Sequence, residues 1–156
     1  MNQLRRLILK GGAGGGALAC ALAAGLLRPS AAFAAEWNKP AFEAKAVADA
    51  LKHIAAAGAT ESAEILIKAP DIAENGAVVP IEVTSRIADA ESIALMVEKN
   101  PFPLLAYVDL ANGAEAYLNT RCKMGQTSVV KVVVKAGGKH YIASREIKVT
   151  IGGCGG

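Results

Sequence analysis

Residues 130–151 read V-K-V-V-V-K-A-G-G-K-H-Y-I-A-S-R-E-I-K-V-T-I, and this stretch decides the fold. Three valines at even positions share one face, opposite two lysines, which is the two-residue period of a half-buried strand. Gly137-Gly138 then marks a turn, and apolar side chains again occupy alternate positions from residue 141 to residue 151. The stretch therefore predicts two strands joined by a glycine turn, each with one face in a core.

Five upstream segments also have the pattern of strands, at 64–68, 81–84, 93–97, 104–110 and 115–119. Asn112-Gly113 precedes the last of them and is a strong hairpin signal. The polar residues of segment 69–76 are interpreted as a solvated connection. Seven short strands at regular intervals predict an all-β fold, an immunoglobulin-like antiparallel β-sandwich.

A different period, typical of a helix, covers residues 40–57. Pro40 suits a first helical turn and Gly58 suits a C-terminal stop. An apolar stripe runs along one side of this predicted N-terminal helix. His53 on the helix and His140 on the last strand have no second ligand at a metal-binding spacing, so both are interpreted as surface or packing residues.

Residues 1–34 are predicted to be a targeting segment that is removed. Arg5-Arg6 is followed by a weakly apolar, glycine-rich run and then by the small-x-small site Ala32-Phe33-Ala34. The arginine pair resembles a twin-arginine signal, which directs export of folded proteins, so a periplasmic location is expected. A retained membrane anchor is the alternative, although the apolar run is short for a membrane span.

Removing this segment changes the charge of the protein. It contains four of the 17 basic residues and none of the 14 acidic ones, so the remaining 122 residues carry 13 basic against 14 acidic side chains. A net charge of about −1 removes the main electrostatic argument for nucleic-acid binding. The length that remains predicts a single domain, residues 35–151, with one core and no membrane segment in the mature form.

The sequence closes with a cysteine between two pairs of glycine, at Gly152, Gly153, Cys154, Gly155 and Gly156. Glycine has the greatest backbone freedom, whereas a structural cysteine packs among apolar side chains. Residues 152–156 are therefore predicted to be a flexible carrier arm that presents the Cys154 thiol, and the four glycines give it mobility and clearance.

The arm contains no cation that would favour the thiolate of Cys154, and the carboxylate of Gly156 disfavours it. Activation is therefore expected from the enzyme pocket that receives the arm. Three alternatives remain open at this point. Cys154 could pair with Cys122 in an intrachain disulfide, it could link a secreted structural module to another chain, or it could be the peroxidatic thiol of an enzyme, which would require a nearby base.

The chain resembles the SoxY family, the sulfur carriers of the periplasmic thiosulfate-oxidising system. The terminal motif of residues 152–156, preceded by Lys148-Val149-Thr150-Ile151, carries the resemblance. The segment 69–76 with Val79-Pro80 after it and the paired arginines of the leader also match. Cys122 is not part of the carrier motif.

This resemblance implies an immunoglobulin-like carrier that is not itself an enzyme and that forms a heterodimer with a SoxZ-like subunit. It also implies that Cys154 holds thiosulfate-derived sulfur covalently. A haem enzyme would attach the sulfur, a metal-dependent hydrolase would release sulfate, and a sulfur dehydrogenase would oxidise the remainder. These cofactors would belong to the partner enzymes. The sequence itself has no metal-ligand spacing, phosphate loop or nucleophile–base pair, so no cofactor is predicted for the chain.

Overall fold

The computed structural model describes residues 37–111 and 113–150. The chain divides into two compact units, Met1–Trp37 and Asn38–Gly156. The predicted targeting segment 1–34 and the predicted arm 152–156 lie outside the described residues. Within the described ranges, no helix is both long and apolar enough to span a bilayer.

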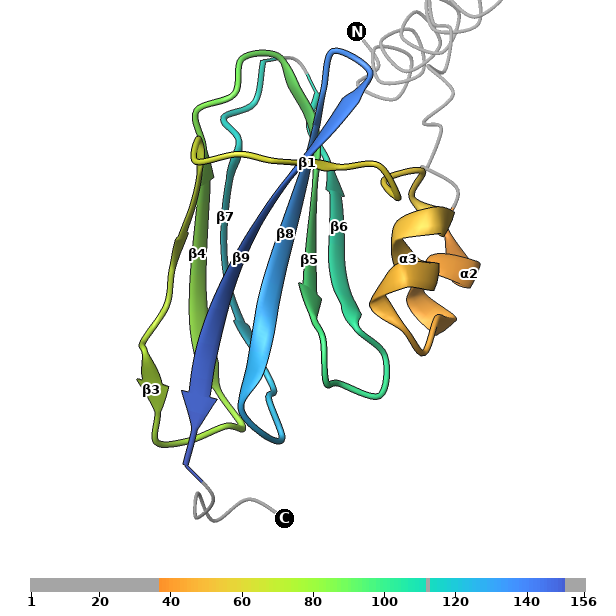
Figure 1. Cartoon of the computed structure of the whole chain (residues 1–156). Helices are drawn as coiled ribbons and strands as arrows, with labels where there is room; N and C mark the ends of the chain where they lie inside the picture. The colour runs from red at the N-terminus through yellow and green to blue at the C-terminus, as the bar shows by residue number, and fades with distance from the viewer. Residues whose placement is uncertain (1–36, 112, 151–156) are drawn as a thin grey trace, which may run out of the picture. The chain divides into compact units, whose positions relative to one another are not determined.

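Two sheets make up the body of the second unit (Figure 1). In the larger sheet the strand order is β1-β9-β8-β5-β6, and β3 also pairs with β9. The smaller sheet has the order β2-β4-β7. The strands are β1 (Thr60–Glu61), β2 (Ile65–Lys68), β3 (Ile72–Ala73), β4 (Val79–Ser85), β5 (Ala90–Val97), β6 (Leu104–Asp109), β7 (Tyr117–Cys122), β8 (Ser128–Ala136) and β9 (Lys139–Val149).

The core lies between the two sheets and is built from the alternating aliphatic side chains of both. The even-numbered valines of β8 and Ile147 of β9 are fully buried against Ile81 and Val83 of β4. Strands β8 and β9 pair antiparallel, with Val134 opposite Tyr141. Gly137 and Gly138 form their turn with φ of +54° and +72°, values that favour glycine. The predicted immunoglobulin-like β-sandwich is confirmed.

The hairpin predicted at Asn112-Gly113 is wrong. Strand β6 pairs with β5 in the larger sheet, whereas β7 pairs with β4 in the smaller one. The connection therefore crosses from one sheet to the other. Gly113 has a φ of +72°, so it does supply a sharp turn, but a turn residue does not determine which strands pair. Asn112 itself lies outside the described residues.

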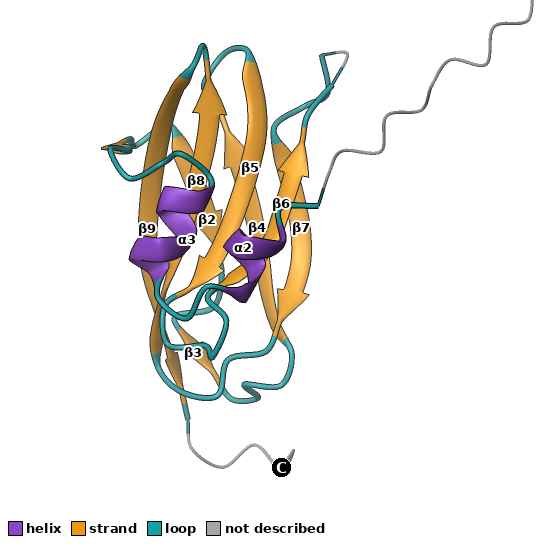
Figure 2. Cartoon of the chain, turned by 90° about the vertical axis from the view of Figure 1, so that its right-hand side faces the viewer, coloured by secondary structure: helices purple, strands orange, loops and turns teal. Residues whose placement is uncertain are grey.

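The single helix predicted over 40–57 is also wrong, because the chain forms two short helices, α2 (Lys39–Glu43) and α3 (Val47–His53). Ala44 and Ala46 between them have extended backbone, with ψ of 139° and 145°. Figure 2 shows both short helices lying against one face of the larger sheet. The break lets small side chains from both helices pack on that face. Tertiary burial outweighs the helical propensity of this alanine-rich stretch. The buried residues of this layer include Ala41, Ala44, Ala50, Ile54, Met96, Leu104 and Val133.

Two very short strands pair parallel with β9, although the sequence predicted only antiparallel pairing. Thr60 of β1 lies opposite Tyr141, and Ile72 of β3 lies opposite Lys148. Strand β3 falls in segment 69–76, which was predicted to be a solvated loop. Its pairing places this segment beside the C-terminal end of β9 (Figure 1).

Candidate functional site

The predicted carrier residue Cys154 and its glycines at 152, 153, 155 and 156 lie outside the described residues. The described chain ends at Thr150, four residues before Cys154. The structure therefore shows what holds the chain up to Thr150. We call the contacts of Lys148, Val149 and Thr150 with neighbouring segments the support.

One side of the support is the strap, a name used here for residues 69–74, which contain β3. The backbone N–H of Lys148 donates to the carbonyl of Asp71 at 3.0 Å, and the N–H of Thr150 donates to the carbonyl of Ala73 at 3.1 Å. The Thr150 hydroxyl also donates to the carbonyl of Glu74 at 3.4 Å. The strap therefore holds the chain as far as Thr150.

The other side of the support is the segment that connects β7 to β8. Successive backbone N–H groups of a strand point to opposite sides, so Val149 is directed away from the strap. Its N–H donates to Oγ1 of Thr127 at 3.0 Å. Nearby, the N–H of Met124 donates to the carbonyl of Gly76 at 2.7 Å. The end of β9 is thus held from both sides.

The Arg145 side chain attaches the strap to β9. No role for this residue was predicted from the sequence. Its Nη1 donates to the carbonyl of Ile67 at 2.9 Å, and its Nη2 forms an ion pair with Oδ1 of Asp71 at 2.8 Å. The sequence did contain a signal, because Arg145 interrupts the apolar face of the last strand. The acceptors of the guanidinium were not visible, since they lie 74 and 78 residues away along the chain.

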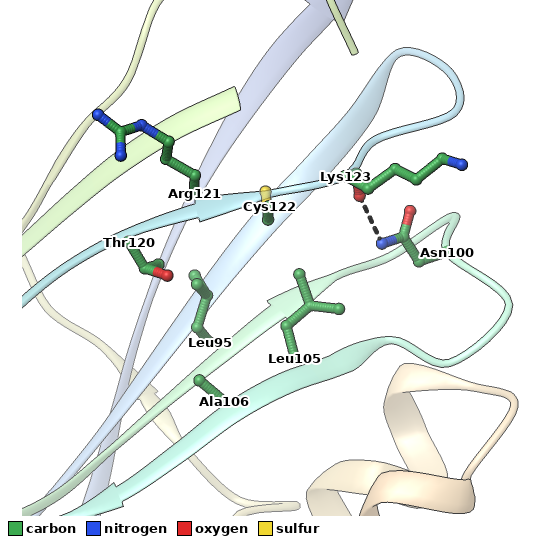
Figure 3. A pocket seen from close by; sticks show the side chains of 8 residues that line it. All are labelled: Leu95, Asn100, Leu105, Ala106, Thr120, Arg121, Cys122 and Lys123. Carbon is green, nitrogen blue, oxygen red and sulfur yellow. Dashed lines mark hydrogen bonds between the residues drawn. The ribbon is translucent and has the colours of Figure 1, made fainter. Parts of the chain in front are cut away.

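Cys122, the second cysteine of the predicted mature chain, lies at the end of β7 against a cavity of about 280 Å³ (Figure 3). Leu95, Leu105 and Ala106 contribute apolar lining from β5 and β6. Across the cavity rim, Nδ2 of Asn100 donates to the carbonyl of Lys123 at 2.9 Å. The Cys122 thiol is free and only 8% exposed, and burial raises its pKa to about 11.

This environment predicts slow chemistry at Cys122, because the thiolate and not the thiol is the nucleophile. At pH 8, iodoacetamide is expected to alkylate Cys122 about 200-fold more slowly in the folded protein than in urea, given an ordinary thiol pKa of about 8.5. The native rate should rise as the pH approaches 11. Peptide mass spectrometry over a time course measures both rates, and equal rates in the folded and unfolded protein would contradict the assignment.

The two histidines are placed separately. His53 is exposed at the end of α3, where its carbonyl accepts a hydrogen bond from Asn38, and His140 is half-buried near the start of β9. Among the residues that the structure describes, no three His, Cys, Asp or Glu side chains form a group suited to a metal ion. The contacts that the structure does show at the site are the hydrogen bonds and the ion pair that hold the end of β9.

Comparison with known proteins adds the family. The model of the sulfur oxidation protein SoxY matches residues 51–154, a range that includes both Cys122 and Cys154. The sulfur carrier protein SoxY from Chlorobium limicola f thiosulfatophilum is 42% identical with a TM-score of 0.58, and the alignment covers 64% of this chain and 94% of that chain. No curated protein sequence matches the chain significantly.

Two other solved structures are much less similar. A chain from a study of T-cell activation by the superantigen toxic shock syndrome toxin-1 is 11% identical, with a TM-score of 0.41 over 55% of this chain and 99% of its own length. An engineered protein is 13% identical, with a TM-score of 0.40 over 57% of this chain and 21% of its own. Both similarities are too low to support any conclusion about the fold or the function of this chain. The family match and the similarity to the Chlorobium carrier together establish that the chain belongs to the SoxY family of sulfur-carrier proteins.

Proposed function

We propose that this protein carries thiosulfate-derived sulfur covalently on Cys154, at the end of a mobile arm formed by residues 152–156. The observation that supports this most is the support at the end of β9: the chain is held through Thr150, and the family match continues from there to Cys154. Cys154 is four positions after Thr150, so the thiol has a reach of about 14 Å from a fixed start. That length is suited to delivering a thiol into an enzyme pocket.

The proposed chemistry requires partner enzymes. In the loading step the Cys154 thiol loses a proton and forms an S–S bond to the outer sulfur of thiosulfate, and a haem enzyme accepts the two electrons released. Hydrolysis of the terminal S–S bond by a metal-dependent hydrolase then leaves a persulfide on Cys154 and releases sulfate. A sulfur dehydrogenase then accepts six electrons from the persulfide while three oxygens from water convert its outer sulfur into a sulfonate. A second hydrolysis of the S–S bond releases sulfate and returns the Cys154 thiol. Cys122 does not compete, because its thiol is buried and protonated at neutral pH.

Membership of the SoxY family implies a SoxZ partner subunit. We further propose that the two subunits form a heterodimer in the periplasm and that the paired arginines near the start of the chain direct folded export. Export in the folded state would allow a partner without its own signal to travel with this chain.

The test is a reconstituted reaction that contains the full chain, a SoxZ-type partner, the three enzymes and thiosulfate. Sulfate release is expected to require the chain and to stop when Cys154 is alkylated beforehand. Since Cys122 reacts slowly, a brief treatment leaves it unmodified and provides an internal control. Undiminished sulfate release after complete alkylation of Cys154 would overturn the proposal, and so would a stable Cys154-linked dimer that accepts no sulfur.

Clearance around the sulfur gives a separate prediction. Gly153→Val and Gly155→Val should slow each enzymatic step by about tenfold or more, because a branched side chain beside Cys154 displaces the thiol in a narrow channel. Reaction of Cys154 with a small reagent should remain unchanged and serves as the control. Rates of sulfate release for the variants measure the effect, and turnover equal to that of the unmodified chain would contradict the clearance argument.

A further inference from the structure

The strap and Arg145 form a connected structure at the base of the proposed arm. We propose that Arg145 is a positioning residue: by attaching the strap to β9, it sets the point at which the arm begins. This inference rests on the proposed carrier function. Arg145 lies five residues before Thr150, so it acts through the strap and not on the sulfur itself.

Asp71 is the link between Arg145 and the end of β9. Its carboxylate accepts from Nη2 of Arg145 at 2.8 Å, while its backbone carbonyl accepts from the N–H of Lys148 at 3.0 Å. The second guanidinium donor binds the carbonyl of Ile67 in β2. The Arg145 side chain therefore connects β9 of the larger sheet to β2 of the smaller sheet and to Asp71 in the strap. Asp71 in turn binds β9 at two positions, Arg145 and Lys148.

The strap has little else to keep it in place. Strand β3 has two residues, and Ile72 leaves 56% of its surface exposed. Ala73 is buried, and Ala69 is half-buried against the core, but both side chains are small, so the apolar area that they remove from water is limited. Ordering each residue costs about 1–2 kcal/mol of conformational entropy, which the burial of two alanines does not offset. The strap therefore depends on its polar contacts, and the two from Arg145 are charge-assisted.

Release of the strap would change the length of the arm. Lys148 and Thr150 would lose their backbone acceptors, whereas Val149 would keep its hydrogen bond to Oγ1 of Thr127 and its packing against the core. The last fixed residue would then be Val149 instead of Thr150, so the tether to Cys154 would grow from four residues to five and its reach from about 14 Å to about 17 Å. A longer tether lowers the effective concentration of the thiol at a docked enzyme roughly as the −3/2 power of its length. Loading should slow by about 1.4-fold.

Arg145→Met in the full chain tests this, with Lys68→Gln as the matched control. Lys68 forms an exposed 2.7 Å ion pair with Glu82 on β4, away from the strap's contacts with β9. Hydrogen exchange of the Lys148 and Thr150 amides is expected to accelerate about tenfold in Arg145→Met and to stay unchanged in Lys68→Gln. Enzymatic loading should fall by about 1.4-fold, with the rate of small-reagent alkylation of Cys154 unchanged. Arg145→Lys, which retains the charge but not the two-pronged geometry, should be intermediate.

Asp71→Ala provides the second variant if Arg145→Met fails to fold, because it removes the carboxylate and keeps the backbone carbonyl that binds Lys148. The positioning role would be overturned if hydrogen exchange of the Lys148 and Thr150 amides is unchanged in this variant. It would also be overturned if their exchange is faster but sulfur loading on Cys154 is not slower. The exchange measurement needs no sulfur cargo. Failure of the carrier function would appear separately, as an unmodified protein that takes up no sulfur on Cys154.

Discussion

Cys154→Ser is expected to abolish sulfur loading while leaving the β-sandwich folded. The reason is chemical, because a serine hydroxyl does not supply the thiolate that forms the S–S bond with thiosulfate. The only other thiol in the predicted mature chain, residues 35–156, is Cys122, which is buried at the end of β7 with a pKa raised to about 11. Thiosulfate-dependent mass increase of the variant, in the presence of its partner and the loading enzyme, measures the effect.

Cys122→Ala is the matched control for this variant. It removes the other thiol and is expected to retain full loading, with a stability cost of about 1 kcal/mol from the loss of a small buried side chain. A Cys154→Ser protein that still gains sulfur would contradict the assignment. If Cys122→Ala folds but no longer takes up sulfur, Cys122 and the cavity beside it, and not Cys154, would be the carrier site.

Gly76→Ala is expected to have the largest effect on stability among single-methyl additions at the described glycines. The added Cβ would fall on the backbone carbonyl of Met124 and lie 2.8 Å from Cγ1 of Val149. Backbone cannot move aside as a flexible side chain does, so the expected cost is about 1–3 kcal/mol. The end of β9 should loosen as well, since Val149 is one residue before Thr150.

Gly125→Ala is the control, because the added Cβ there meets nothing within 4 Å. It should be neutral, or stabilising by up to about 1 kcal/mol through a less flexible unfolded chain. Urea unfolding followed by circular dichroism gives both midpoints. If the urea midpoints of Gly76→Ala and Gly125→Ala agree within error, the absence of a side chain at residue 76 is not required for its close approach to the Met124 carbonyl.

The fold was predictable where local pattern and tertiary pairing agree. The valines of β8 and the apolar positions of β9 have the period of buried strands, and Gly137-Gly138 joins neighbours that do pair. Asn112-Gly113 has equally strong turn chemistry, yet it connects strands in different sheets. Turn residues determine that the chain reverses, whereas the choice of partner strand depends on contacts between distant segments, which periodicity does not contain.

The break between α2 and α3 has a similar cause. Nothing in the alanine-rich segment marks Ala44 or Ala46 as non-helical, because alanine is the strongest helix former. The break appears only once the larger sheet supplies Met96, Leu104 and Val133 as a surface on which both short helices pack. A helix of this length is marginal alone, so the packing surface determines where it ends.

For the candidate site, the sequence predicts Cys154 and its glycines, which lie outside the described residues, and the structure contributes the support at the end of β9. Residues 69–74 lie in segment 69–76, which was predicted to be a solvated loop because of its polar, turn-rich composition. Their role follows instead from backbone hydrogen bonds to Lys148 and Thr150, which do not depend on side-chain type. Backbone pairing over two residues leaves almost no trace in composition, so the strap could not have been found from sequence alone.

The central claim is tested most directly by mass spectrometry of the C-terminal tryptic peptide. Cleavage after Lys148 yields residues 149–156, in which Cys154 is the only thiol. Protein isolated after turnover with thiosulfate should show this peptide with added mass that corresponds to sulfur atoms or to a sulfonated sulfur, and reduction should remove it. An unmodified 149–156 peptide under conditions of active thiosulfate oxidation would contradict the account.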